Sequence, residues 1–186
     1  MFLSILSLQG VCGTLLNVSF ETDVQLFQSK GEITGCGLGF VGIEDGSKFS
    51  QQVRLVSGSI ALFSSGAGLT KVVMTTLKYD PSRKQQSDAP LSKVTDFWMR
   101  RTGGKIITSA NKKLIPSADN KDALLQVISS NDFADLFKAI NSDDEFQVGV
   151  SAKNEKNELI FAGKLKVSDK DIKRLEDCMT SLFEAK

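Results

Sequence analysis

The sequence predicts an α+β fold: an antiparallel curled sheet or β-sandwich-like meander with two amphipathic helices in the C-terminal third. Residues 14–79 hold a succession of apolar, β-branched runs separated by short turn signals, which is typical of strands joined by tight turns. Two segments of the C-terminal third instead repeat their apolar residues with the period of a helix. Because strands and helices are segregated along the chain, an α+β class is favoured over alternating βαβ units.

The N-terminal half is predicted to form four strands. They cover residues 14–20, 33–43, 53–63 and 69–79. In the second strand, Gly35, Gly37 and Gly39 alternate with other residues, so one strand face is nearly bare. A bare face indicates a bulge, a bend or another backbone packed close to the strand.

Two connections follow these strands. Residues 80–90 contain two of the three prolines and almost no apolar side chain, so they are predicted to form an exposed loop. Residues 96–108 are predicted to form a hairpin around Gly103 and Gly104, because a Gly-Gly pair suits a two-residue tight turn.

The C-terminal third is predicted to contain a strand at 123–128, a helix, a hairpin with strands at 146–150 and 159–167, and a final helix. Ser130 or Asn131 is available to cap the first helix. Its apolar face consists of Phe133, Leu136, Phe137 and Ile140.

Ser168 opens the final helix, and Asp171 occupies the capping-box position three residues later. The predicted buried stripe of this helix consists of Ile172, Leu175, Cys178, Met179 and Leu182.

Histidine is absent from the chain. Its absence excludes Ser-His-Asp and Cys-His catalysis and the zinc sites that are built on imidazole. No cysteine spacing suits a metal, and the glycine-rich run at 35–39 lies inside a predicted strand rather than before a helix. The sequence therefore predicts no cofactor and no metal ligand, and it assigns no catalytic residue.

Residues 1–13 form a candidate leader, and residues 14–186 form a single domain. The apolar run at 2–8 (FLSILSL) is followed by Gly10 and Gly13, which resembles the core and cleavage region of a secretory signal, although the basic region before it is missing. Export predicts a periplasmic or secreted protein, whereas a first buried strand in a cytoplasmic protein is the alternative. No run of about 20 apolar residues is present, so no membrane span is predicted.

The cysteines also bear on export. Removal of the leader would remove Cys12 and leave Cys36 and Cys178, and an even pair in an exported protein predicts a disulfide. Cys178 lies on the apolar stripe of the final helix, and the glycines beside Cys36 would give that helix room to approach. The alternative is that both residues are buried, reduced thiols.

A basic region covers residues 71–113, which contain ten basic and three acidic residues together with the only Tyr and the only Trp of the chain. Within it, Trp98, Arg100, Arg101 and Lys105 are predicted to bind an anionic surface of a partner, most simply another protein. The net charge of +1 disfavours nucleic acid. In the alternative interpretation, Arg100 and Arg101 are solvated hairpin flanks.

These observations favour a non-enzymatic binding or assembly module that is exported, such as a periplasmic inhibitor, an adaptor or an envelope-assembly subunit. One alternative is an enzyme that uses Lys and Asp/Glu chemistry without His. Another is a binder of an anionic partner such as nucleic acid through the basic 71–113 region.

Overall fold

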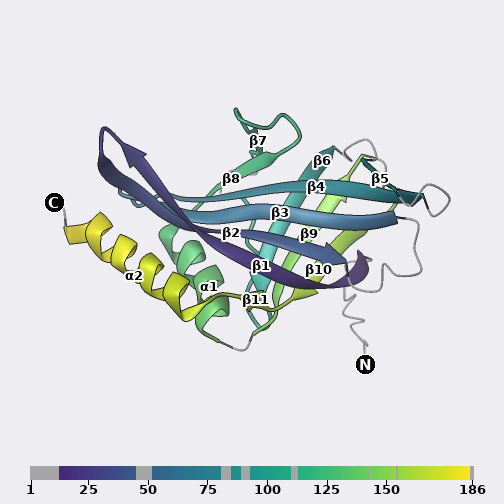
Figure 1. Ribbon diagram of the computed structural model, residues 1–186. Helices are drawn as coiled ribbons and strands as arrows, with labels where there is room; N and C mark the ends of the chain where they lie inside the picture. Colours follow the sequence, from purple (N-terminus) through teal and green to yellow (C-terminus); the bar gives the residue numbers. More distant parts are fainter. Residues whose placement is uncertain are drawn as a thin grey trace, which may run out of the picture.

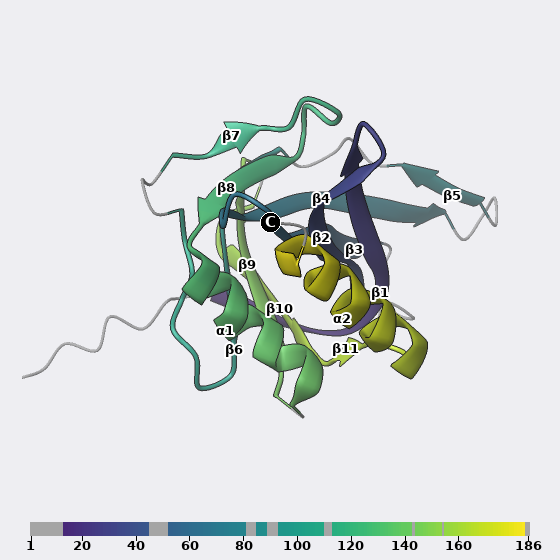
Figure 2. The same cartoon turned by 90° about the vertical axis from the view of Figure 1, so that its left-hand side faces the viewer.

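The computed structural model describes residues 13–44, 52–80, 85–88, 93–109, 113–142, 144–153 and 155–184. Its elements are β1 (Gly13–Ser29), β2 (Glu32–Glu44), β3 (Gln52–Phe63), β4 (Gly68–Asp80), β5 (Gln85–Asp88), β6 (Val94–Arg101), β7 (Ile115–Pro116), β8 (Leu124–Ile128), α1 (Ser130–Asn141), β9 (Phe146–Ala152), β10 (Glu158–Gly163), β11 (Leu165–Lys166) and α2 (Asp169–Glu184). The predicted α+β class is confirmed. Figures 1 and 2 show both helices on the same side of β2 and β3.

The strands form one sheet in the order β6-β9-β10-β1-β2-β3-β4-β8-β7, with β11 added to β1 and β5 added to β4. Most neighbours are antiparallel, but β1 runs parallel to β10 and to β11, which corrects the fully antiparallel prediction. The parallel pairs use the first part of β1: Gly13–Asn17 pair with β10, and Phe20 and Glu21 pair with β11. The C-terminal hairpin therefore adds to the edge of β1 that lies opposite β2.

The main core lies between the two halves of the curled sheet. Phe20 of β1 and Phe40 of β2 meet edge to face, with ring centroids 5.7 Å apart. Phe146 of β9 approaches both rings, at 5.3 and 5.4 Å, so side chains from opposite halves interlock. Leu136 of α1 is fully buried in the same cluster. Edge-to-face aromatic pairs and apolar burial therefore hold the two halves of the sheet and α1 together.

The second core attaches α2 to β2 and contains the predicted disulfide. Cys36 and Cys178 are bonded, with their Cα atoms 6.0 Å apart, so this prediction is confirmed. Leu38, Leu175 and Leu182 are buried around the bond. However, the prediction that the glycines beside Cys36 make room for the final helix is wrong. Because side chains alternate along a strand, Gly35, Gly37 and Gly39 face away from the surface that Cys36 presents to α2.

Both helices begin at a serine cap. Ser168 accepts a hydrogen bond from the Asp171 backbone N–H at 3.1 Å, as the capping-box position predicts. The cap of α1 is Ser129 rather than Ser130 or Asn131, and its hydroxyl accepts from the Asp132 N–H at 3.1 Å. Asp132 returns a contact to the Ser129 backbone, and this reciprocal pair moves the helix start by one residue.

Two predicted connections differ from the structure. Part of the expected loop at 80–90 is strand β5, which pairs with the end of β4, and the remainder of 81–90 lies outside the described residues. The expected hairpin at 96–108 turns back after Arg101, but it forms only one bridge, between Met99 and Ile107. The second arm therefore contributes no continuous strand. Residues 1–12 of the candidate leader are also outside the described part, and Gly13 is the first residue of β1.

Candidate functional site

Strand β6 sends the predicted contact residues in opposite directions. Trp98 and Arg100 share one face of β6, whereas Arg101 lies on the face that α1 covers, because successive side chains alternate. Lys105 follows the turn after β6 and also reaches α1. The structure therefore brings Arg101 and Lys105 together along one helix and leaves Trp98 and Arg100 as a separate pair.

Trp98 supports Arg100 from within the sheet surface. The indole is only 8% exposed, and its Nε1 donates a hydrogen bond to Glu158 at 2.8 Å. It lies over Gly149, where any Cβ would overlap the ring. The Arg100 guanidinium stands 5.3 Å from the ring centroid, and its Nε donates to Gln147 at 2.7 Å. Trp98 thus positions a cation by a cation–π contact.

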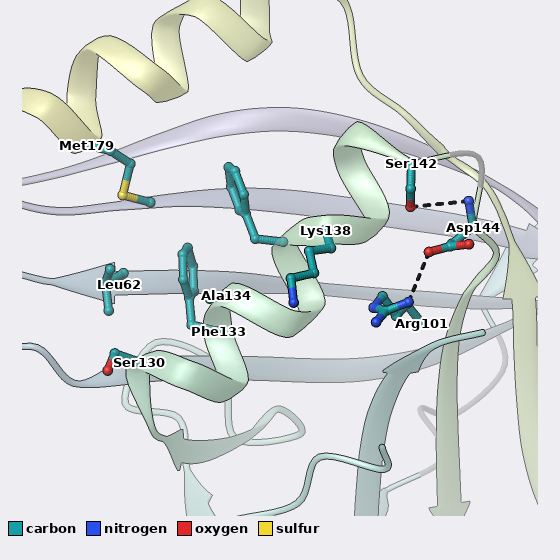
Figure 3. Close-up of a pocket in the computed structure, with 10 residues that line it drawn as sticks. Leu62, Arg101, Ser130, Phe133, Ala134, Lys138, Ser142, Asp144 and Met179 are labelled. Atoms are coloured by element: carbon teal, nitrogen blue, oxygen red, sulfur yellow. Dashed lines mark hydrogen bonds and ion pairs between the residues drawn. The ribbon is translucent and has the colours of Figure 1, made fainter. Parts of the chain in front are cut away.

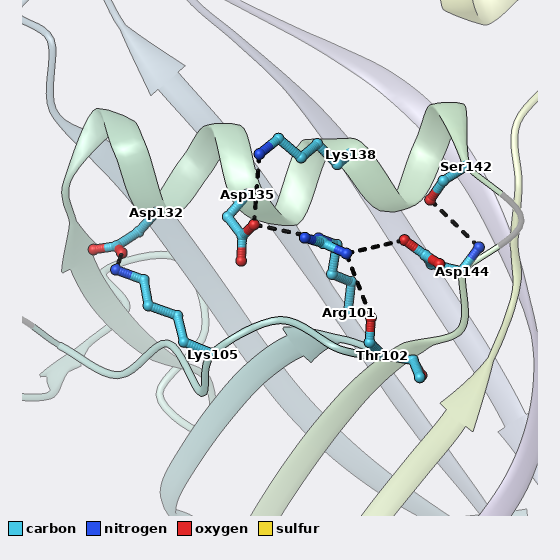
Figure 4. Close-up of polar contacts among 8 residues, drawn as sticks. All are labelled: Arg101, Thr102, Lys105, Asp132, Asp135, Lys138, Ser142 and Asp144. Carbon is cyan, nitrogen blue, oxygen red and sulfur yellow. Dashed lines mark hydrogen bonds and ion pairs between the residues drawn. The ribbon is translucent and has the colours of Figure 1, made fainter.

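Arg101 joins three elements through its guanidinium (Figure 4). Its Nε donates to Asp135 of α1 at 3.2 Å, and one terminal nitrogen donates to Asp144, just before β9, at 3.1 Å. The Lys138 ammonium lies 3.9 Å from the same Asp135 oxygen. Arg101 is therefore held by intramolecular partners and fixes the distance between β6 and α1.

Lys105 pairs with Asp132 at 2.5 Å. The hydrogen bond to Asp132 raises the pKa of Lys105. Burial alone would raise the pKa of Asp132, but hydrogen bonds from Lys105 and Ser129 outweigh this effect and hold its pKa below the usual value. Both groups consequently stay charged near neutral pH. A nucleophilic lysine requires the opposite shift, so this site does not activate Lys105 for covalent chemistry.

A shallow hollow of about 550 Å³ runs along α1 beside this network (Figure 3). Its floor is mostly apolar, with Phe133 and Phe137 stacked at 5.4 Å between ring centroids. The lining residues are Leu62, Arg101, Ser130, Phe133, Ala134, Phe137, Lys138, Ser142, Asp144 and Met179. They come from β3, β6, both helices and the segment before β9, so only the folded chain assembles the hollow.

The charges beside the hollow are arranged by depth. The Lys105 and Lys138 side chains are each 65% exposed, whereas their partners Asp132 and Asp135 are only 16% and 18% exposed. The carboxylates therefore lie beneath the ammonium groups. An approaching molecule meets cations first, although the acids below reduce the net field.

Sequence patterns identified only part of this site. Arg101 and Lys105 were among the predicted contact residues, and Phe133 and Phe137 were predicted to be buried on a helix. Nothing in the sequence indicated that Met179 of α2 would lie beside them, because this proximity depends on how the two helices pack on β2 and β3.

Within the described ranges, no group of three or more Cys, Asp or Glu residues is arranged to hold a metal ion. Neither helix in that part of the chain is long and apolar enough to cross a membrane. Comparisons with known proteins found no matching family model, no matching curated protein and no matching solved structure.

Proposed function

We propose that the protein is a non-enzymatic binding or assembly module of an oxidising compartment, and that the hollow along α1 docks an acidic amphipathic segment of a partner protein. The observation that carries this proposal is an open apolar floor bordered by the exposed ammonium group of Lys138, with that of Lys105 farther along α1. Of the predicted contact residues, Arg101 lines this hollow with its guanidinium held by Asp135 and Asp144, and Lys105 lies near it on the same side of α1.

The floor supports apolar docking. Phe137 and Met179 are only half-buried although they lie against the core, so part of their surface still faces water. An apolar side chain seated there would remove that surface from solvent, at about 25 cal/mol per Å². An amphipathic helix that lays its apolar face into a groove is a recurrent form of such recognition.

The rim supports an acidic partner. Lys138 borders the hollow with its ammonium group outside the partly buried Asp135, and Asp144, the acid that lines the hollow, is already paired with Arg101. Lys105 adds an exposed ammonium group farther along α1. Exposed pairs of this kind contribute mainly to association rate and specificity, and salt screens them. Arg100, supported by Trp98, is a third cation and lies on the other face of β6.

The disulfide supports export. Bonded cysteines persist in secreted and periplasmic proteins and are rare in the reducing cytoplasm. Cys36 and Cys178 tie α2 to β2, and α2 contributes Met179 to the hollow. A periplasmic inhibitor, an adaptor and an envelope-assembly subunit all fit this proposal.

Selection from a random peptide library displayed on phage tests the proposed function. On the oxidised protein we expect enriched peptides with apolar residues at i, i+3 or i+4 and flanking Asp or Glu. Fluorescence polarisation with a synthetic peptide then gives the dissociation constant. Ala134→Trp should fill the hollow from an exposed helix position and weaken binding at least tenfold.

Charge variants complete the test. Lys138→Glu should weaken binding of the selected peptide several-fold and reduce the salt dependence of that binding. Lys173→Glu serves as the charge-matched control, because Lys173 is exposed on α2 and does not line the hollow. Enrichment without any preference for acidic residues, or equal binding to the Ala134→Trp protein, contradicts the proposal.

A further inference from the structure

A second, more polar groove crosses the opposite face of the sheet. It has a volume of about 730 Å³ and is formed by β1 to β4, by β8 and by residues 117–120. Figures 1 and 2 show the β7–β8 connection rising on the side of β4 that faces away from both helices. The groove is therefore separate from the hollow along α1.

One cross-strand row explains why the groove exists. In register, the residues of this row on β1, β2, β3, β4 and β8 are Asp23, Gly39, Ser59, Lys71 and Leu125. The smallest side chains of the row are on β2 and β3, whereas β1, β4 and β8 carry longer ones. The row from Asp23 to Lys71 crosses three strand spacings, or about 14 Å. The sheet itself therefore forms a floor with raised borders.

Gly39 shapes one border of the floor. A Cβ at this position would lie 2.5 Å from the Gln25 side-chain nitrogen and would also collide with the Asp23 carboxylate. Glycine lets both polar side chains lie down over β2 and point into the groove. This gives the bare face of the second strand a role that differs from the predicted one, because the face receives side chains rather than α2.

The opposite border is held by an ion pair. Lys71 contacts Asp119 at 2.6 Å, and the Ser117 hydroxyl also bonds to Asp119. These contacts fix the β7–β8 connection beside the groove. Ser57 and Ser59 supply half-buried hydroxyl groups on the floor between the two borders.

We propose that this groove binds a neutral carbohydrate chain. Hydroxyl groups of a sugar both donate and accept hydrogen bonds, and the groove offers matching groups in Asp23, Gln25, Ser57, Ser59 and Asn120. Apolar side chains of the groove, from Val41, Val73, Leu125 and Phe27, suit the C–H faces of sugar rings. The length of the floor fits an oligosaccharide better than one sugar ring.

Other ligand classes fit the groove less well. A nucleic acid requires several cations along its backbone, whereas the charged lining residues are Asp23, Asp119 and Lys71. An extended peptide usually recognises free main-chain groups at a strand edge, but the floor belongs to β2 and β3, whose backbones are paired with a strand on each side. Side-chain recognition of a neutral polar ligand remains the best match.

Titration of the ¹⁵N-labelled oxidised protein with maltohexaose, cellohexaose and chitohexaose tests this proposal. At millimolar ligand we expect at least one of the three to shift amide signals of residues 23–25, 39, 57–59 and 117–120. Ser59→Leu should fill the floor and weaken binding of that sugar at least tenfold. Thr75→Leu is the matched control, because Thr75 is half-buried on the same face of β4 but does not line the groove.

A second variant distinguishes weaker binding from misfolding of Ser59→Leu. If Ser59→Leu lowers the melting temperature, Gln25→Ala removes a polar group of the border without adding volume and should also weaken binding. The proposal is overturned if none of the three sugars shifts these amides, if Ser59→Leu and Gln25→Ala both bind like the unmodified protein, or if a heparin fragment binds the groove in place of the neutral sugars.

Discussion

Arg100 and Arg101 are adjacent in the chain, yet the fold uses them differently. Arg100 lies over the Trp98 ring on one face of β6, where only Gln147 accepts from its Nε among the described residues. Arg101 lies on the other face and contacts two carboxylates, of Asp135 and Asp144. One arginine is therefore suited to contact a partner, whereas the other connects parts of the fold.

This difference predicts unequal effects on stability. Arg101→Ala should lower the free energy of unfolding by about 1–2 kcal/mol, because Asp144 loses its cation and the partly buried Asp135 keeps only the more distant Lys138. Arg100→Ala should cost only about 0.5 kcal/mol, the scale of an exposed cation–π contact. Urea denaturation of both variants measures the difference, and equal losses would contradict the assignment. Arg101→Glu should be worse than Arg101→Ala, since it places a third carboxylate beside Asp135 and Asp144.

Asp119 gives a pH-dependent prediction. Hydrogen bonds from Lys71 and Ser117 lower its pKa to about 2 in the folded protein. The unfolded value is about 3.9, so the contribution to stability is present above that pH and is lost as the pH falls through the folded pKa. An NMR titration of the carboxyl carbon should show this low pKa, and Lys71→Met should raise it. An unchanged pKa in Lys71→Met would show that the ion pair is not its cause.

At the scale of elements, α2 depends on both packing and a covalent bond. Leu175 and Leu182 bury its apolar face against β2, and Cys178 links it to Cys36 across a sequence separation of 142 residues. A bond that closes so long a loop restricts the unfolded chain strongly.

Replacing Cys36 and Cys178 by Ala should therefore lower the free energy of unfolding by about 2–5 kcal/mol. Hydrogen exchange should increase most in α2, because this terminal helix then relies on its apolar stripe alone. Met179 would lose its fixed position, so peptide binding in the hollow should weaken as well. A denaturation midpoint that matches the oxidised parent protein would refute a stabilising role for the bond.

In the whole molecule, the edge strand β6 of the sheet is covered by contacts from other parts of the chain. Among the described residues, β6 is the last strand at one end of the order, so no further strand runs along its outer edge. Ile107 pairs with Met99 there, and the buried Gln126 side chain of β8 donates to the Phe97 carbonyl. Gln126 thus joins one end of the sheet to a strand near the other end and limits pairing with other chains.

Gln126→Met tests this connection with little change in volume. It should lower the free energy of unfolding by about 1–2 kcal/mol, because the buried Phe97 carbonyl loses its donor. Amide exchange along β6 should rise, and concentrated samples should aggregate sooner than the parent protein. Light scattering and hydrogen exchange measure these effects. Unchanged exchange in β6 would show that apolar packing alone closes the curl.

Local patterns were sufficient for much of the secondary structure. The strands near 33–43, 53–63 and 69–79 and both C-terminal helices were predicted, because alternation and helical periodicity depend on neighbours in sequence. The Ser168 cap was predicted for the same reason, whereas the cap of α1 is Ser129 because Asp132 completes its capping box. The extension of β1 to Ser29 was missed, since residues 21–29 are largely exposed and carry a weak apolar pattern.

The sequence by itself determined the α+β class and the helix faces, since each follows from local periodicity. It predicted the pairing of Cys36 with Cys178 on the premise that Cys12 leaves with the leader, and the structure decided between this bond and two reduced thiols. Only the tertiary structure decided that β10 joins β1 in parallel, that Arg101 faces α1 while Arg100 does not, and that Gly39 and Ser59 share one groove. These features depend on register and on contacts between residues far apart in the chain. A shift of one residue would exchange the two faces of a strand, and no local pattern fixes that choice for every pair.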